Sequence, residues 1–299
     1  MSNSSPVTTS TIITLFNSSS YLNDLIGSLA SQTRPLSQII FVDDGSTDET
    51  IQCLKELLKN FNMRFSKILV LKMHMNSGVA SAFNVGLKHV VSDILFFTGH
   101  DDIWMPNRVE RTIQEFLTDA SISFLHSSYL RFGDIPGEVL AVTSHDELIA
   151  SMLFGNAIGA ITVAIDLRKV EKSNVRLNPR YEGAEDYDLW ADLILSGHKV
   201  KGIPEILMKY RTTPSTLSRS FDYRSNPVDL AVRDRLRSKV LNTLSKFEQT
   251  TLIDMLLKLR RQGITLSEQQ AKVYEHLSLK ILQAGNHDHF AVARSKLLS

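Results

Sequence analysis

The stretch Phe41-Val-Asp-Asp-Gly-Ser-Thr-Asp48 joins an apolar segment to a segment with helical spacing. Residues 37–42 (SQIIFV) are typical of a buried strand, and residues 49–58 (ETIQCLKELL) of a helix that follows it. Asp43 and Asp44 would therefore lie at the carboxyl end of a strand, which is the edge where open α/β sheets bind ligands. The pattern predicts an α/β enzyme whose ligand carries hydroxyl or nitrogen donors, because aspartate accepts hydrogen bonds from such groups.

Strand-like and helix-like patterns alternate along the first 120 residues. We expect strands at 11–16, 37–42, 67–73 and 92–98, and helices at about 18–31, 48–60 and 79–90. Strands that are separated by helices favour right-handed crossovers and parallel pairing. The alternation predicts an α/β fold with a Rossmann-like, mostly parallel sheet.

The remainder of the chain is less regular and ends in helical patterns. We expect a helix at about 107–118, strands at 121–132 and 158–165, a helix at 184–195, and two short strands at about 198–203 and 205–210. From Pro227 onward the spacing is helical throughout. The sequence therefore predicts a C-terminal helical extension after the α/β part.

The composition is that of an ordinary globular chain. Its 299 residues are 43% hydrophobic and 22% charged, which suffices for a full core and a small second domain. The net charge is +1, so we expect no nucleic-acid partner. Residues 1–10 lack the regions of a signal peptide, and no apolar run reaches the roughly 20 residues of a membrane span. The single cysteine, Cys53, is expected to be reduced, as in a cytoplasmic protein.

Charge is distributed unevenly. Residues 1–224 contain 21 Lys and Arg against 25 Asp and Glu, a net of −4, whereas residues 225–299 contain 12 against 7, a net of +5. Two interpretations of the basic C-terminal region stay open. It is either a helical subdomain packed on the rest of the chain, or a contact surface for a membrane or a partner enzyme. The expected location is cytoplasmic, with peripheral contact at the inner face of the membrane as the second possibility.

Acidic residues stand at four places where the expected elements begin or end. Asp43 and Asp44 end one strand, Asp101 and Asp102 follow another, the pair 185–186 begins a helix, and Asp188 follows in that helix. Carboxylates that share one edge of a sheet repel one another unless a cation or a hydrogen-bonding ligand neutralises them. Mg²⁺ or Mn²⁺ between carboxylate and phosphate oxygens would meet that need.

Taken in order along the chain, these motifs resemble a known family. The segments are 12–17 (IITLFN), 42–48 (VDDGSTD), 76–78 (NSG), 100–108 (HDDIWMPNR) and the pair 185–186 (ED). Their combination is similar to that of the family 2 glycosyltransferases of the A-type fold, which are inverting enzymes that use nucleotide-activated sugars. The resemblance covers about residues 9–215.

The resemblance implies a division of the chain. Residues 1–10 would be a polar N-terminal tail, residues 11–224 the catalytic domain, and residues 225–299 a helical C-terminal region. Within the catalytic domain, residues 11–120 would bind the nucleotide and residues 121–224 the acceptor.

The resemblance also implies the residues of the site. The nucleotide-sugar site would consist of Thr14, Phe16, Asn17, Asp44, Asn76, Gly78, His100 and Asp101. Asp44 would accept from the nucleobase, His100 would lie against the ribose, and Asp101 would hold Mn²⁺ or Mg²⁺ as the last carboxylate of an Asp-x-Asp motif. Asp186 would be the general base.

The reaction implied is a single displacement. The base takes a proton from an acceptor hydroxyl, whose oxygen attacks the anomeric carbon while a nucleoside diphosphate leaves from the opposite face. Uridine diphosphate sugars are the commonest donors of the family, so a UDP-sugar is the expected donor. A glycan or a lipid-linked glycan is the expected acceptor.

Three positions depart from the family pattern. Gly99 replaces the first Asp of the Asp-x-Asp motif, Phe83 replaces an arginine, and Thr213 replaces a histidine. These changes leave room for weak metal binding, with Arg211 as a source of compensating charge. They also keep open a degenerate protein that binds a nucleotide or glycan without turnover. A nucleotidyltransferase is a further alternative, although the residues after the first strand lack the glycine- and basic-rich loop that such an enzyme uses.

Overall fold

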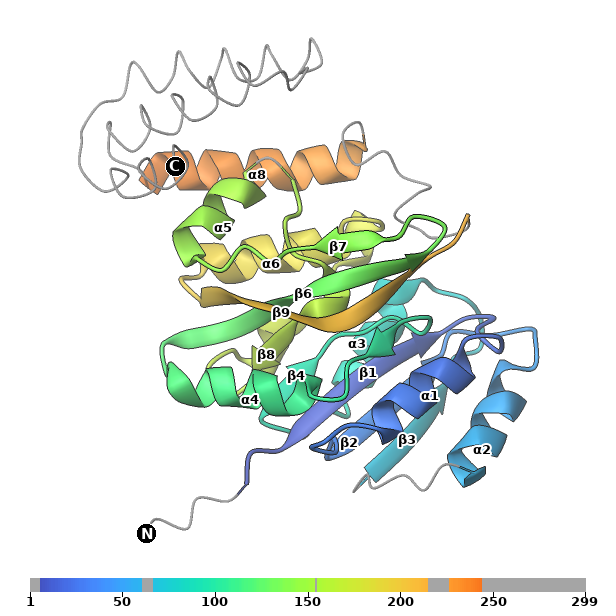
Figure 1. The fold of residues 1–299 in the computed structure, drawn as a ribbon. Helices are drawn as coiled ribbons and strands as arrows, with labels where there is room; N and C mark the ends of the chain where they lie inside the picture. Colours follow the sequence, from blue (N-terminus) through green and yellow to red (C-terminus); the bar gives the residue numbers. More distant parts are fainter. Residues whose placement is uncertain (1–5, 61–66, 154, 215–225, 244–299) are drawn as a thin grey trace.

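The structure, a computed structural model, describes residues 6–60, 67–153, 155–214 and 226–243. These residues form a mixed sheet with helices on both faces (Figure 1). The helices are α1 Leu22–Ala30, α2 Thr50–Asn60, α3 Val79–Leu87, α4 Arg108–Thr118, α5 His145–Met152, α6 Glu185–Leu195 and α8 Pro227–Thr243. The strands are β1 Thr9–Leu15, β2 Gln38–Asp43, β3 Lys67–Lys72, β4 Ile94–Phe96, β5 Ile103–Trp104, β6 Ile122–Gly133, β7 Gly137–Val139, β8 Ala164–Asp166 and β9 Lys199–Thr212.

The sheet runs in the order β3-β2-β1-β4-β8-β6-β9-β5, and β7 pairs with the outer part of β6. Strands β3, β2, β1 and β4 are all parallel to one another, whereas β8 lies antiparallel between β4 and β6. The chain leaves β1 toward β2 on one side and reaches β4 on the other. The carboxyl end of β1 is therefore the point where the strand order reverses, and ligands bind at such points in open α/β sheets.

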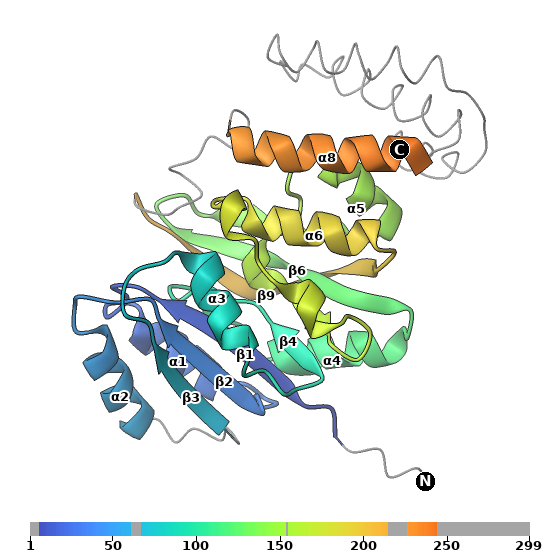
Figure 2. The same cartoon turned by 180° about the vertical axis from the view of Figure 1, so that it is seen from behind.

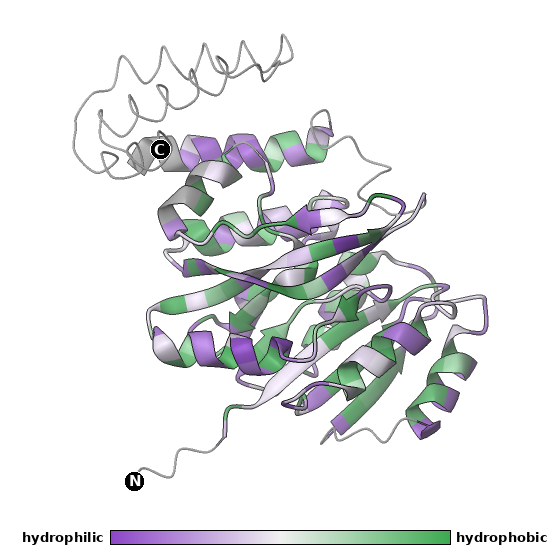
Figure 3. Cartoon of the chain, viewed as in Figure 1, coloured by the Kyte–Doolittle hydropathy of each residue, from purple (hydrophilic) through white to green (hydrophobic). Residues whose placement is uncertain are grey.

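The two faces of the sheet carry separate hydrophobic cores. Leu15 and Phe41 point to the face covered by α1 and α4, and Ile12 and Val42 point to the face covered by α3 and α6. Figures 1 and 2 show these two helix layers from opposite sides. Strands β1 and β2 are buried along nearly their whole length because both of their faces are covered. The covering helices mix hydrophilic and hydrophobic stretches along their length (Figure 3), as helices with one wet face do.

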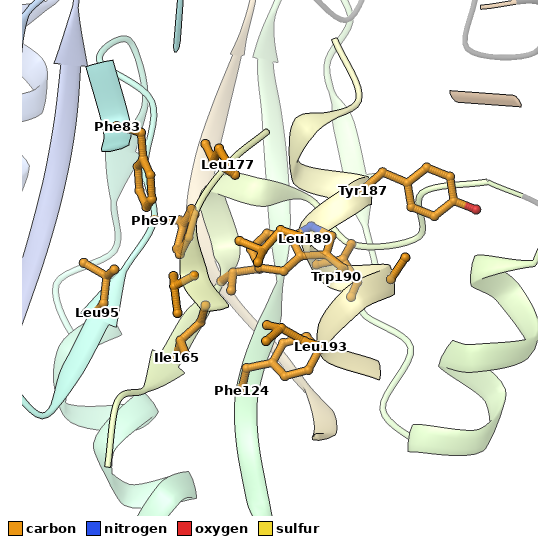
Figure 4. Close-up of a cluster of buried hydrophobic side chains, with 14 of the residues drawn as sticks. Phe83, Leu95, Phe97, Phe124, Ile165, Leu177, Tyr187, Leu189, Trp190 and Leu193 are labelled. Atoms are coloured by element: carbon orange, nitrogen blue, oxygen red, sulfur yellow. The ribbon is translucent and has the colours of Figure 1, made fainter. Parts of the chain in front are cut away.

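The larger core surrounds Trp190 of α6 (Figure 4). Its ring meets Phe97 edge-on at 5.2 Å between centroids and stacks on Phe124 at 6.0 Å. Phe83 of α3 stacks on Phe97 at 4.8 Å. This aromatic cluster ties α6, which is far along the chain, to the parallel half of the sheet, so α6 is held in a defined place beside α3.

The α/β fold class expected from the sequence is confirmed, and two strand predictions were wrong in detail. The two short strands expected at 198–203 and 205–210 are one strand, β9. Its register against β6 shifts between Ile203 and Ile206, so Pro204 sits in a bulge, where a strand tolerates proline. The strand expected at 158–165 is instead a 3₁₀ turn, Ala160–Thr162, followed by the three-residue β8.

The C-terminal region is described only as far as α8. This helix packs along α6 (Figure 2) and buries Val232 and Leu236 in the core around Trp190. The described part of the region is thus helical and packed on the α/β domain, as one of the two interpretations expected. The rest of it, residues 244–299, lies outside the described residues. None of the helices among the described residues is both long and apolar enough to cross a membrane.

Candidate active site

Asn17 organises the loop after β1. Its backbone is left-handed, with φ +48°, a conformation that asparagine tolerates better than most residues. Its side-chain Oδ1 accepts hydrogen bonds from the backbone N–H of Thr47 at 2.9 Å and of Asp48 at 3.3 Å. Its own N–H donates to Ser46 Oγ at 3.0 Å. Asn17 therefore fastens the loop after β1 to the loop after β2 at the carboxyl edge of the sheet.

Asp44 binds the loop that precedes α3. Its two carboxylate oxygens accept from the backbone N–H of Ser77 and of Gly78, each at 2.9 Å. Asn76 Oδ1 accepts from the same Gly78 N–H at 3.1 Å. Each carboxylate oxygen keeps a further lone pair for a ligand. Asp44 thus shapes the loop expected to pass the nucleotide, in addition to any contact with the base.

Gly45 lets these two loops touch. Its φ is +74°, and a Cβ at this position would lie 2.7 Å from the backbone carbon of Met75. The approach of backbone to backbone leaves no room for a side chain. Neighbouring Asp43 is fully buried and holds the same turn by accepting from Ser46 N–H at 3.0 Å, so its role is structural.

His100 connects the loop after β4 to the end of β1. Its ring donates to the backbone of Thr14 and lies against the Tyr21 ring, with 5.9 Å between centroids. Burial lowers the pKa of His100, and both the Asp101 charge and the Thr14 hydrogen bond oppose that effect. The imidazole is therefore neutral at neutral pH. Phe16, the first residue of the loop after β1, is 40% exposed.

The turn at residues 99–102 places one accessible carboxylate. Asp101 is half-buried, whereas Asp102 is fully buried and accepts from the backbone N–H of Arg211 at 3.0 Å. Burial, with the nearby Asp101 charge, raises the pKa of Asp102 well above its ordinary value. A Cβ on Gly99 would lie 2.6 Å from Asp102 Oδ2 and 3.0 Å from Asp101 Oδ1. The space where the family motif has its first Asp is thus filled by the other two carboxylates.

Arg211 fixes this turn. Its Nε donates to the backbone oxygen of Asp101 at 2.9 Å, and its Nη2 pairs with Asp24 of α1 at 2.7 Å. Its guanidinium also lies over the rings of Tyr21 and Phe132. Arg211 therefore holds the turn in place, and its charge is already committed to Asp24.

Asp101 is the candidate protein ligand for a divalent metal ion. Within the parts of the chain that the structure describes, no group of three or more His, Cys, Asp or Glu side chains is arranged to hold a metal ion. Mg²⁺ commonly binds through one or two carboxylates together with substrate phosphates. Asp101 fits that arrangement as a single protein ligand beside a diphosphate.

Asp186 begins α6 and has a strongly perturbed carboxyl group. Burial, reinforced by the charge of Glu185, raises the pKa of Asp186 to about 7. Its Oδ2 accepts from Asn156 Nδ2 at 2.8 Å, and its Oδ1 accepts from the Tyr187 N–H. A carboxyl group that titrates near neutral pH in a ligand-binding region is typical of a general acid or base.

The start of α6 lies beside the nucleotide loop. A Cβ on Gly78 would come within 3.9 Å of Glu182 Oε1, and Glu182 precedes the first turn of α6. The structure thus brings the residues expected at the nucleotide site into one region: Thr14, Phe16, Asn17, Asp44, Asn76, Gly78, His100 and Asp101. Asp186 lies four residues after Glu182, in the first turn of α6.

Two residues near Asp186 have roles that the sequence did not indicate. Asn156 contacts the carboxylate directly although it lies in an irregular loop without a recognisable motif. Asp188, an acidic residue of α6, forms a buried ion pair with Arg235 of α8. The position where the family has arginine, Phe83, is a core residue of the aromatic cluster.

The chain is similar to known glycosyltransferases in sequence and in fold. Residues 10–154 match the model of the family described as Glycosyl transferase family 2. The chain is 29% identical over 217 residues to the UDP-Glc:alpha-D-GlcNAc-diphosphoundecaprenol beta-1,3-glucosyltransferase WfgD of Escherichia coli, which covers 70% of this chain and 79% of that protein. It is 24% identical over 227 residues to the amylovoran biosynthesis glycosyltransferase AmsE of Erwinia amylovora, covering 74% and 83%.

Among solved structures, Staphylococcus aureus TarS residues 1–349 in complex with UDP-GlcNAc superposes with a TM-score of 0.63 at 19% identity, covering 83% of this chain and 71% of that one. The fold is the A-type glycosyltransferase fold. Residues 10–154, just under half of the chain, therefore form a glycosyl transferase family 2 segment.

Proposed function

We propose that the protein is an inverting glycosyltransferase that moves a sugar from a nucleoside-diphosphate sugar, with UDP as the nucleotide, to a hydroxyl of a glycan or lipid-linked acceptor. The observation that carries the proposal is Asp186, a carboxyl group with a pKa of about 7 at the start of α6, where Glu182, which precedes the helix, lies beside the loop ordered by Asp44. The names of relatives support the substrates, since WfgD is named for UDP-Glc and a diphosphoundecaprenol acceptor.

The steps assigned to the chain begin with the acceptor. Asp186 takes the proton of the attacking hydroxyl as the bond to the anomeric carbon forms, and the bond to the diphosphate breaks on the opposite face. The loop at Ser77 and Gly78, held by Asp44, orients the nucleotide. Asp101 would hold Mn²⁺ or Mg²⁺, which when bound supplies positive charge for the leaving diphosphate. Neutral His100 would lie against the ribose.

The pH dependence of the reaction follows from the pKa of Asp186. The base works in its ionised form, so the rate should fall as the pH falls through about 7. The measurement is the release of UDP from UDP-glucose and from UDP-N-acetylglucosamine, with an N-acetylglucosamine diphospholipid as the acceptor, between pH 5 and pH 9.

Asp186→Asn tests the base directly. We expect this variant to lose at least about 10²-fold in kcat, the usual contribution of a general base, with little change in the KM of the donor. Glu182→Gln, an exposed neighbour, serves as the matched control and should stay near the native rate. Native turnover by Asp186→Asn would contradict the assignment.

A degenerate binding protein is the second candidate, motivated by Gly99 and Phe83. A thermal-shift comparison of UDP-sugars with and without Mn²⁺ distinguishes the two, because a ligand that binds the folded state raises Tm by mass action. Stabilisation by a donor without any release of UDP from it would favour the degenerate protein.

A further inference from the structure

Asn156 lies in the loop after α5, beyond the segment that matches the family. Its exposed side chain reaches Asp186 Oδ2 at 2.8 Å. We propose that Asn156 is a positioning residue for the general base, which holds the Asp186 carboxylate in the orientation that accepts the proton of the acceptor hydroxyl. This inference rests on the proposed function, because it assumes that Asp186 is the base.

The orientation of the Asn156 amide follows from its second hydrogen bond. Its Oδ1 accepts from the backbone N–H of Ile158 at 3.1 Å, and a backbone N–H can only donate. The NH₂ group must therefore face Asp186, so the contact is a donated hydrogen bond to a carboxylate. Bonds of this kind are stronger than those between neutral groups and restrict the geometry of the acceptor.

The carboxylate is held from two directions. Asn156 binds Oδ2, and the Tyr187 N–H of the first turn of α6 binds Oδ1. Each oxygen keeps one lone pair, so the group can still accept a proton from an acceptor hydroxyl. Without Asn156, the carboxylate would be held on one oxygen and could rotate about its side-chain torsion.

The chain that leads into the Asn156 loop is anchored to the helices behind the site. The hydroxyl of Tyr187 donates to the backbone oxygen of Met152, and Arg237 Nε donates to that of Leu153 at 2.6 Å. Tyr187 lies on α6 and Arg237 on α8. The loop and the base are thus supported by the same two helices, which makes their relative position reproducible.

The charges around Asp186 make this hydrogen bond important. Glu185 stands next to it and raises its pKa, and Glu182 faces Glu185 from the preceding turn. The arginines of α8 are committed elsewhere, because Arg235 pairs with Asp188 and Asp192 and Arg233 lies by Asp229. Among the hydrogen bonds found for the described residues, Asn156 provides the side-chain donor to Asp186.

The test is a direct titration of Asp186 in the whole protein without substrate. Protein labelled with ¹³C at the aspartate carboxyl carbons is followed by NMR from pH 4 to pH 9, and the resonance that Asp186→Asn removes is assigned to Asp186. We expect Asn156→Ala to raise the midpoint by about one pH unit, since it removes a hydrogen bond to the ionised form. Asn156→Asp, which keeps the size of the side chain, should raise it further by adding a second carboxylate.

The matched control is Asn178→Ala. Asn178 donates to Asp188 on the same first turn of α6, so this variant removes an equivalent amide from the neighbouring acid. It should leave the Asp186 midpoint unchanged. An unchanged midpoint in both Asn156 variants, each with native Tm, would overturn the proposal. If Asn156→Ala does not fold, the size-matched Asn156→Asp decides alone.

Turnover separates a failure of this inference from a failure of the proposed function. In the UDP-release assay, the acid limb of kcat/KM for Asn156→Ala should move by the same amount as the NMR midpoint, with the KM of the donor unchanged. If Asp186→Asn is inactive and the acid limb of kcat/KM for Asn156→Ala does not move, the positioning role of Asn156 is overturned and Asp186 remains the base. A fully active Asp186→Asn overturns both.

Discussion

Asp186 costs the folded protein stability whenever it is ionised. Its pKa is about 7 in the folded state and near 3.8 in the unfolded chain, so the folded state binds the proton more tightly. The penalty is absent below about pH 4, develops as the pH rises toward 7, and is complete above 7. A carboxylate kept at this cost is what an active site needs when it must hold a base close to neutral pH.

Asp186→Asn should therefore stabilise the protein while abolishing turnover. We expect a gain of about 1–3 kcal/mol in the free energy of unfolding at pH 8, and no gain near pH 4, where the native carboxyl is already neutral. Urea denaturation at both pH values measures the difference. Asp101→Asn is the comparison. Equal free energies of unfolding for Asp186→Asn and native protein at pH 8 would show that ionisation of the Asp186 carboxyl group does not destabilise the folded state.

At the scale of elements, α8 acts as a brace for α6. Arg235 binds Asp188 and Asp192, one turn apart on α6, while Val232 and Leu236 enter the core around Trp190. Asp188 is only 5% exposed, so its charge depends on this partner. Helix α8 lies outside the segment that matches the family, yet it supports α6, which carries the proposed base.

Arg235→Met should expose the cost of that buried charge. We expect a loss of about 2–4 kcal/mol in the free energy of unfolding, because Asp188 would be left buried without its partner. Arg235→Met combined with Asp188→Leu should recover most of the loss, and Lys239→Met, on the exposed side of α8, should change little. Denaturant titration of the four proteins measures this. A loss that the double variant does not recover would place the effect outside the ion pair.

The sequence could predict the parallel half of the sheet because local signals agree there with tertiary structure. The apolar run at residues 37–42 is buried on both faces, and a helix follows it directly along the chain. The second half depends on long-range pairing. Pro204 looked like a break between strands, but β6 pairs with β9 on both sides of it and the bulge absorbs it.

The same distinction applies to the site. Asp44 and Asp101 could be found because each follows a strand that ends at the carboxyl edge. Asn156 could not, because an asparagine in an irregular loop has no periodic signal, and its partner lies 30 residues away. The pairing of Asp188 with Arg235 was hidden for a similar reason, since it joins two residues that lie 47 positions apart on different helices.

At the scale of the whole molecule, the proposed reaction requires that the two halves of the α/β domain keep a fixed relative position. The loops proposed to bind the nucleotide follow the parallel strands, whereas the proposed base stands on α6, in the second half of the domain. Arg211 at the end of β9 joins them, because its side chain pairs with Asp24 of α1 and donates to the backbone oxygen of Asp101, and its backbone N–H donates to Asp102 Oδ1. Its position explains why arginine is useful there even though its charge is not available to the diphosphate.

Arg211→Leu should loosen the turn that carries Asp101 and leave the base intact. We expect UDP in the presence of Mn²⁺ to bind about tenfold or more weakly, since the loss of a hydrogen bond to a charged group is worth about 1.5–3 kcal/mol. The midpoint of Asp186 in the NMR titration should stay where it is. Isothermal titration calorimetry gives the affinity, and Arg111→Leu, which removes the ion pairs of α4 with Glu115 and Glu205, is the matched control. Unchanged UDP affinity would mean that the turn keeps its shape without Arg211. A shifted Asp186 midpoint would mean that the two halves of the domain are coupled more tightly than these contacts indicate.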